Sequence, residues 1–125
     1  MDPELEKLAT DALNAAFEIH TNFGPGLLER VYLMLLVSKL KRMGYSVEQE
    51  VPVTFSYEGD VFHDAFRIDV LVEKRLVIEL KSVEALAPVF AKQVLTYLRL
   101  MDLRLGLLIN FGAAHLKDGI KRIAN

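Results

Sequence analysis

Two acids and a lysine lie in two segments in the middle of the chain that are otherwise apolar except for Arg67. Asp69 lies within residues 66–72, and Glu79 and Lys81 lie near the end of residues 76–81. Carboxylate oxygens are the ligands that Mg²⁺ and Mn²⁺ prefer in proteins. A nearby lysine can hold or deprotonate a water molecule, or neutralise negative charge that develops during a reaction. These three residues are therefore our candidates for a metal-dependent hydrolytic centre.

The two segments have the composition of β-strands joined by the charged turn 73–75. Side chains alternate between the faces of a strand, so alignment of the apolar faces fixes the register. Four apolar residues of the first strand should share one face: Phe66, Ile68, Val70 and Val72. The register pairs three further positions on the other face: Asp69 with Glu79, Arg67 with Lys81, and Leu71 with Val77.

This register predicts two carboxylates side by side, which destabilises a sheet unless a cation lies between them. A divalent ion bound by Asp69 and Glu79 would remove the repulsion. The alternative is that both are solvent-facing strand residues that form ion pairs with Arg67 and Lys81. An acid followed ten residues later by Glu-x-Lys is a common pattern, and by itself it favours this alternative.

Three helical residues are further candidates. Glu29 shares a helical stripe with Leu33 and Leu36, so we expect it to point toward the core, where a carboxylate needs a partner. A role as a capping or partly exposed residue is an equal alternative. Gln93 and Tyr97 lie one helical turn apart and can both reach the strand face. The simpler explanation is that Gln93 and Tyr97 are ordinary residues of the helix surface and of the rim of the core.

The remaining pattern predicts a mixed α/β fold. We expect helices at about 3–22, 25–43 (largely buried) and 88–101, and a short amphipathic helix at 116–123. An edge strand at 46–56, a turn at 57–60 and a buried strand at 105–109 complete the elements. The length of 125 residues and the 52% hydrophobic content fit one domain over residues 1–125.

Composition limits the classes of function. The net charge of −2 gives no global positive field that favours nucleic acid. The absence of cysteine excludes disulfides and thiolate metal sites. No uncharged stretch is long enough to span a bilayer, and the acidic start lacks a signal-peptide pattern, so we expect a cytoplasmic protein without membrane contact. The mean hydropathy of +0.25 favours a homodimer.

Taken together, these residues resemble a known family. Gly26, Glu29 and Tyr32 match the GxxExxY signature of the family named for it. Asp69, the tripeptide 79–81 and the pair Gln93 and Tyr97 match motifs of the PD-(D/E)xK nuclease superfamily, to which that family is assigned. The resemblance runs from about Ala15 to the C-terminus. Ile68 stands where the superfamily name has proline, at a position that varies widely.

The resemblance implies a restriction-endonuclease-like core, α-β-β-β-α-β, with a mixed four-stranded sheet and one extra helix before it. It also implies a divalent metal, Mg²⁺ or Mn²⁺, with Asp69 and Glu79 as ligands and the main-chain carbonyl of Leu80 completing the protein ligands. Glu29 would support the metal or its waters, and Lys81 would be the catalytic lysine. Gln93 would orient Lys81 or touch a backbone phosphate, and Tyr97 belongs to the same motif.

The function that follows is phosphodiester hydrolysis in DNA or RNA by a metal-activated water. The alternative is a catalytically silent module with the nuclease fold, which acts as a dimeric interaction protein or binds nucleic acid without cleaving it. The acidic balance and the high apolar content favour this alternative. Divalent-ion binding separates the metal enzyme from a module without a metal.

Overall fold

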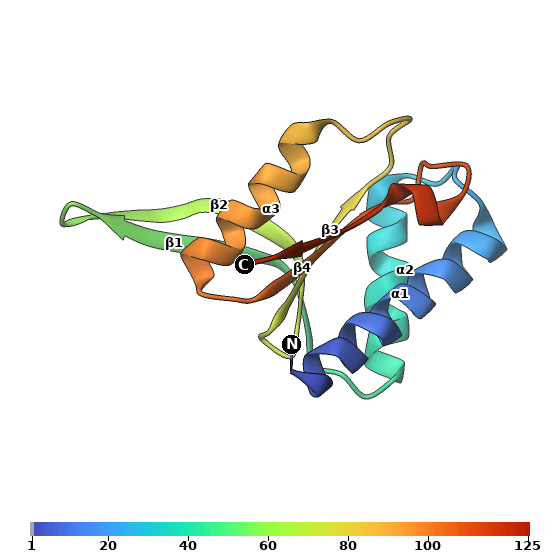
Figure 1. Ribbon diagram of the computed structural model, residues 1–125, viewed down its shortest axis with the longest axis horizontal. Helices are drawn as coiled ribbons and strands as arrows, with labels where there is room; N and C mark the ends of the chain where they lie inside the picture. Colours follow the sequence, from blue (N-terminus) through green and yellow to red (C-terminus); the bar gives the residue numbers. More distant parts are fainter. Residues whose placement is uncertain (1) are drawn as a thin grey trace.

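The computed structural model describes residues 2–125, which form three α-helices, one short 3₁₀ helix and a five-stranded sheet (Figure 1). The helices are α1 (Pro3–Phe23), α2 (Glu29–Arg42), α3 (Pro88–Met101) and η1 (Leu116–Gly119). The strands are β1 (Val47–Tyr57), β2 (Asp60–Val72), β3 (Leu76–Lys81), β4 (Leu105–Asn110) and β5 (Ile120–Ala124). No helix in this part of the chain is long and apolar enough to cross a membrane.

The sheet order is β1-β2-β3-β4-β5, and all neighbours are antiparallel except β3 and β4. The parallel pair is connected through α3, as a parallel connection requires a crossover. Elements α2 to β4 thus follow the expected order α-β-β-β-α-β, and α1 is the expected extra helix. The sheet has one strand more than we predicted.

The additional strand is β5, where the sequence predicted an amphipathic helix at 116–123. Ile120 and Ile123 have helical spacing, but in β5 they contact the apolar clusters on opposite faces of the sheet. Gly119 ends the 3₁₀ helix, where an added Cβ would lie 2.5 Å from the Asn110 carbonyl oxygen. The chain then pairs with the free edge of β4, which offers backbone hydrogen bonds that no local pattern reveals.

Helix α1 begins as predicted. The Asp2 carboxylate accepts hydrogen bonds from the Glu4 and Leu5 N–H groups, and Pro3 occupies the first turn. Helix α2 begins at Glu29 and not at the predicted residue 25, because residues 24–28 are held in a loop. This loop is fixed by the Tyr32 hydroxyl, which donates to the Gly24 carbonyl and accepts from the Leu27 N–H at 3.1 Å.

The prediction that α2 is largely buried was wrong. Only one face of the helix is buried, with Tyr32, Leu36, Val37 and Leu40 in the core. Met34 on the other face is 61% exposed, because α2 packs against α1 and the sheet and has no neighbour beyond them.

Two apolar clusters cover the two faces of the sheet. Helices α1 and α2 pack on one face, against residues such as Val70, Ile78 and Leu107. Helix α3 packs on the other face, with Val94 and Leu98 against residues of β2, β3 and β4. The candidate site lies where this two-sided core ends.

Hairpin β1–β2 is longer than predicted, because β2 begins at Asp60 and not at residue 66. Its outer part projects beyond the rest of the molecule as an arm, on the side away from α1 and α2 (Figure 1). The predicted common face of β2 was also wrong. Val70 and Val72 belong to the cluster under α1 and α2, whereas Phe66 and Ile68 pack with the α3 cluster. The alternation of faces therefore breaks at Asp69.

Candidate active site

The candidate site begins where the β2–β3 ladder ends. The ladder consists of Val72–Leu76, Leu71–Val77 and Val70–Ile78, so the predicted pairing of Leu71 with Val77 is confirmed. Two predicted pairs are not ladder pairs. Asp69 and Glu79 lie one step past the last pair, and Arg67 lies opposite Pro52 of β1 and not opposite Lys81. The strands part at this point because β2 turns away into the arm.

Two crossed hydrogen bonds replace the ladder between Asp69 and Glu79. The Asp69 N–H donates to Glu79 Oε1 at 2.9 Å, and the Leu80 N–H donates to Asp69 Oδ2 at 2.8 Å. Each carboxylate therefore binds the backbone of the opposite strand through one oxygen. The two acids face each other, as the register predicted, but across a gap that their own side chains bridge.

Burial disfavours the charged forms of both acids. Glu79 is only 8% exposed, and burial, followed by the charge of Asp69, raises its pKa to about 8. Burial also raises the pKa of Asp69, against the lowering effects of the Leu80 N–H and the charge of Lys81. Such perturbed acids in one place are typical of functional sites.

The alternative of simple ion pairs with Arg67 and Lys81 does not match the geometry. Six ion pairs connect side chains among residues 2–125, and none of them includes Asp69 or Glu79. The Lys81 ammonium lies instead over the ring of Phe90 of α3, 4.3 Å from its centroid. The two acids thus remain without a cation bound to them in the described chain.

Helix α3 brings Tyr97 to the site and leaves Gln93 at the surface. Tyr97 stacks on Phe66 of β2, with ring centroids 4.3 Å apart. The pKa of its hydroxyl is raised, first by burial and then by the negative charges of Glu79 and Asp69, so both acids act on this group. Gln93 is exposed and forms no side-chain hydrogen bond with residues 2–125.

Glu29 lies at the rim of the site. The sequence predicted that it points toward the core, and this prediction was wrong. The residue is exposed at the first position of α2. The pKa of its carboxyl group is nevertheless raised, first by partial burial and then by the charge of Asp69, while Lys81 and the Ser82 N–H act in the opposite direction. Glu29 therefore faces the same space as Asp69.

The loop before α2 places Glu29 through a buried tyrosine. Tyr32 is fully buried, stacks on Phe111 with centroids 4.3 Å apart, and holds Gly24 and Leu27 through its hydroxyl. The Ser82 hydroxyl adds a bond of 2.9 Å to the Leu27 carbonyl, which ties this loop to the end of β3. The Glu and the Tyr of the GxxExxY pattern thus have separate tasks.

Asn110 is a positioning residue that sequence reasoning missed. Its buried side chain accepts hydrogen bonds from the N–H groups of Val83 and Gly112 at 3.0 Å, and donates to the Val83 carbonyl at 2.9 Å. A Cβ on Gly112 would lie 2.4 Å from the same carbonyl oxygen. These contacts fix the chain just after Lys81. The available signal was an Asn at the end of a wholly apolar strand.

Glu50 is the second residue that the sequence did not reveal. A small pocket of about 80 Å³ is lined by six residues: Glu29, Arg30, Leu33, Glu50, Asp69 and Leu80. In the β1–β2 register Glu50 falls opposite Asp69, between the pairs Gln49–Val70 and Val51–Ile68. It occurs in a run of polar residues that reads as solvent-exposed strand, so no local pattern distinguishes it.

The donor set fits a hard divalent ion. Among residues 2–125, no group of three or more His, Cys, Asp and Glu side chains is arranged as a metal site. Asp69 and Glu79 are two adjacent carboxylates, and the Leu80 carbonyl lies between Glu79 and Lys81 in sequence. An all-oxygen set with few protein ligands suits Mg²⁺ or Mn²⁺, which keep several waters, and does not suit zinc. The residues present are therefore compatible with the expected ion.

Comparison of the chain with protein-family models agrees with this geometry, whereas two further comparisons found no match. No curated protein and no solved structure matches the chain. The family model described as the PD-(D/E)XK nuclease superfamily matches residues 6–123, which is nearly the whole chain. The chain therefore belongs to the PD-(D/E)XK nuclease superfamily.

Proposed function

We propose that this protein is a metal-dependent nuclease that hydrolyses phosphodiester bonds in DNA or RNA. The observation that carries the proposal is the pair Asp69 and Glu79. Glu79 is buried and Asp69 is half-buried, and the two acids face each other without a cationic partner. Burying such a pair costs stability, and a fold retains this cost where it serves a function. Membership of a nuclease superfamily supplies the reaction class.

In this proposal each residue has one task. Asp69 and Glu79, with the Leu80 carbonyl, would hold the ion, and Glu29 at the rim would hold its hydration water. When bound, Mg²⁺ or Mn²⁺ lowers the pKa of a water molecule and polarises a phosphoryl oxygen. Lys81, positioned by Phe90, neutralises negative charge on the phosphate or orients the attacking water.

The α3 residues contact the substrate in our proposal. Tyr97 lies beside the two acids and is only partly buried, so it can approach a bound phosphodiester. Gln93, one turn earlier, is exposed and can orient Lys81 or bind a backbone phosphate. Both tasks are weaker than those of the acids, and single substitutions there should reduce cleavage without abolishing it.

The test is cleavage of single- and double-stranded DNA and of RNA by the purified chain with Mg²⁺, Mn²⁺ or a chelator. We expect metal-dependent cleavage by the wild-type chain. Glu79→Gln, which keeps the size of the side chain, and Lys81→Ala should each reduce the rate by a factor of about 100 or more.

Lys41→Ala is the matched control, because Lys41 is an exposed lysine on α2 that forms no ion pair within residues 2–125. It should cleave like the wild-type chain, and circular dichroism should show the same fold for all variants. Absence of metal-dependent cleavage from every substrate, or full activity of Glu79→Gln, would contradict the proposal.

One observation favours the second candidate, a silent dimeric module. Five large apolar side chains on and beside α1 and α2 are exposed: Phe17, Phe23, Leu28, Met34 and Met43. Burial of such residues between two copies is a common basis of dimer formation. Light scattering of the wild-type chain and of Met34→Glu tests the dimer. A dimer that binds Mn²⁺ yet cleaves no nucleic acid would favour this candidate over the nuclease.

A further inference from the structure

Glu50 has a backbone conformation that its place in a strand does not require. Its φ is 52°, in the left-handed region that glutamate rarely adopts. Glu58, Glu73, Lys74 and Asp102 share this feature in turns or at a helix end. Asp64 shares it within β2, in the exposed arm where the β1–β2 register shifts, far along the strand from the site. Within a strand such a conformation is costly and often marks a functional position.

The consequence of this conformation is the position of the Glu50 side chain. Val47 packs in the cluster under α1 and α2, whereas Val51 packs with the α3 cluster, so β1 changes face at Glu50 as β2 does at Asp69. Regular pairing of the two residues is lost, and the Glu50 side chain lines the small pocket beside Asp69, Glu29 and Leu80. A third strand thus contributes a carboxylate to the site.

No three acids among residues 2–125 form a metal-binding group, so we assign Glu50 no direct bond to the ion. Its charge nevertheless acts on Asp69 across the pocket. A carboxylate that lines the same pocket as a metal ligand is well placed to bind the water that a hydrated divalent ion retains.

We infer that Glu50 is a positioning residue of the site, whose carboxylate accepts hydrogen bonds from the hydration water of a divalent ion held by Asp69 and Glu79. This inference rests on the proposed function. In this inference the left-handed φ of Glu50 places a carboxylate that increases metal affinity, in addition to bending the arm.

The experiment is calorimetric titration of the full chain with Mn²⁺, with thermal unfolding of the metal-free protein measured in parallel. Glu50→Gln keeps the size of the side chain and should weaken Mn²⁺ binding by a factor of about 10 or more, the usual effect of losing a group that holds a ligand of the metal. Glu50→Asn should weaken binding to the same degree, since asparagine tolerates a left-handed φ.

The metal-free unfolding temperature of both variants should equal or exceed that of the wild-type chain, because each loses a negative charge close to Asp69. Glu48→Gln is the matched control: Glu48 lies two residues earlier on β1, pairs with Leu71 and does not line the pocket. It should bind Mn²⁺ like the wild-type chain.

Wild-type Mn²⁺ affinity in Glu50→Gln would overturn the inference and leave the proposed function intact. A lower unfolding temperature that accompanies the lost affinity would also overturn it, since Glu50 would then act through the fold. If the wild-type chain binds no Mn²⁺, the proposed function fails and this inference fails with it.

Discussion

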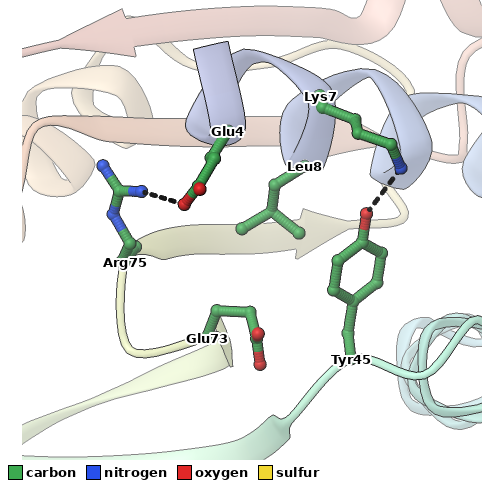
Figure 2. A pocket seen from close by; sticks show the side chains of 6 residues that line it. All are labelled: Glu4, Lys7, Leu8, Tyr45, Glu73 and Arg75. Atoms are coloured by element: carbon green, nitrogen blue, oxygen red, sulfur yellow. Dashed lines mark hydrogen bonds and ion pairs between the residues drawn. The ribbon is translucent and has the colours of Figure 1, made fainter. Parts of the chain in front are cut away.

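Two clusters of charged side chains among residues 2–125 differ in pairing, in burial and in the direction of their pKa shifts. One is the site around Asp69 and Glu79. The other is a pocket of about 370 Å³ between the start of α1 and the β2–β3 turn (Figure 2). It is lined by six residues, Glu4, Lys7, Leu8, Tyr45, Glu73 and Arg75. This pocket at α1, which we call the α1 pocket, is several times larger than the small pocket beside Asp69.

Both cations of the α1 pocket, Lys7 and Arg75, form ion pairs near the surface. Arg75 binds Asp2 at 2.5 Å and Lys7 binds Asp11 at 2.8 Å, and the hydrogen bonds from these cations lower the pKa of each acid. The two acids of the site have no such cation, are largely buried, and have raised pKa values. Pocket size therefore does not identify the candidate active site. Acids that are buried without a cation identify the site around Asp69 and Glu79.

The largest expected difference between the two clusters is in metal-dependent stability. At an Mn²⁺ concentration about 100 times the dissociation constant, binding should raise the free energy of unfolding of the wild-type chain by about 2.7 kcal/mol. Glu79→Gln should lose this gain, because the charge that attracts the ion is gone. Thermal unfolding with and without Mn²⁺ measures the effect.

The double variant Glu4→Gln with Glu73→Gln is the control at the α1 pocket. Both acids line that pocket, so their removal should leave the Mn²⁺-dependent gain unchanged. Loss of the gain in this variant, with retention in Glu79→Gln, would reverse the assignment of the two clusters.

The second expected difference is in pH dependence without metal. Because the pKa of Glu79 is raised from 4.5 to about 8, the folded chain retains a proton that the unfolded chain has released. The stability that this proton provides is fully present below pH 4.5, the pKa in the unfolded chain. It is lost as the pH rises through about 8, the pKa in the folded chain. The free energy of unfolding should fall by at most about 1.4 kcal/mol per pH unit from this group.

Urea unfolding of the chelator-treated chain at several pH values between these limits checks this slope. Glu79→Gln should flatten it. The α1 pocket acts with the opposite sign: the pKa values of Asp2 and Asp11 are lowered, so their contribution is present at neutral pH and lost under acidic conditions. A wild-type stability that rises from mildly acidic to mildly alkaline pH would contradict the unpaired state of Glu79.

The smallest expected effect concerns the ion pairs of the α1 pocket. Arg75→Gln removes the cation that contacts Asp2 and Glu4, all on the surface. Exposed pairs contribute little, so we expect a loss of less than about 1 kcal/mol, which high salt reduces further. Denaturant titration at low and high salt measures it. A loss of several kcal/mol would mean that the two clusters do not differ as described.

The residue pattern alone predicted the meeting of Asp69 and Glu79, because the apolar residues around them fix the register of a hairpin with a three-residue turn. It did not predict the break in alternation at Asp69, which lies opposite the change of face at Glu50 on the neighbouring strand. For the same reason Glu50 itself was missed. The formation of β5 also depends on pairing between distant segments, because it pairs with β4, whereas its local residue spacing favoured a helix.

The most direct measurement of the central claim is a crystal of the chain soaked in Mn²⁺ and analysed by anomalous scattering. We expect one Mn²⁺ peak between the carboxylates of Asp69 and Glu79, with the Leu80 carbonyl among its ligands and Glu50 contacting its water. No peak between these carboxylates, or a peak between Glu4 and Glu73 of the α1 pocket in its place, would contradict our assignment of the site.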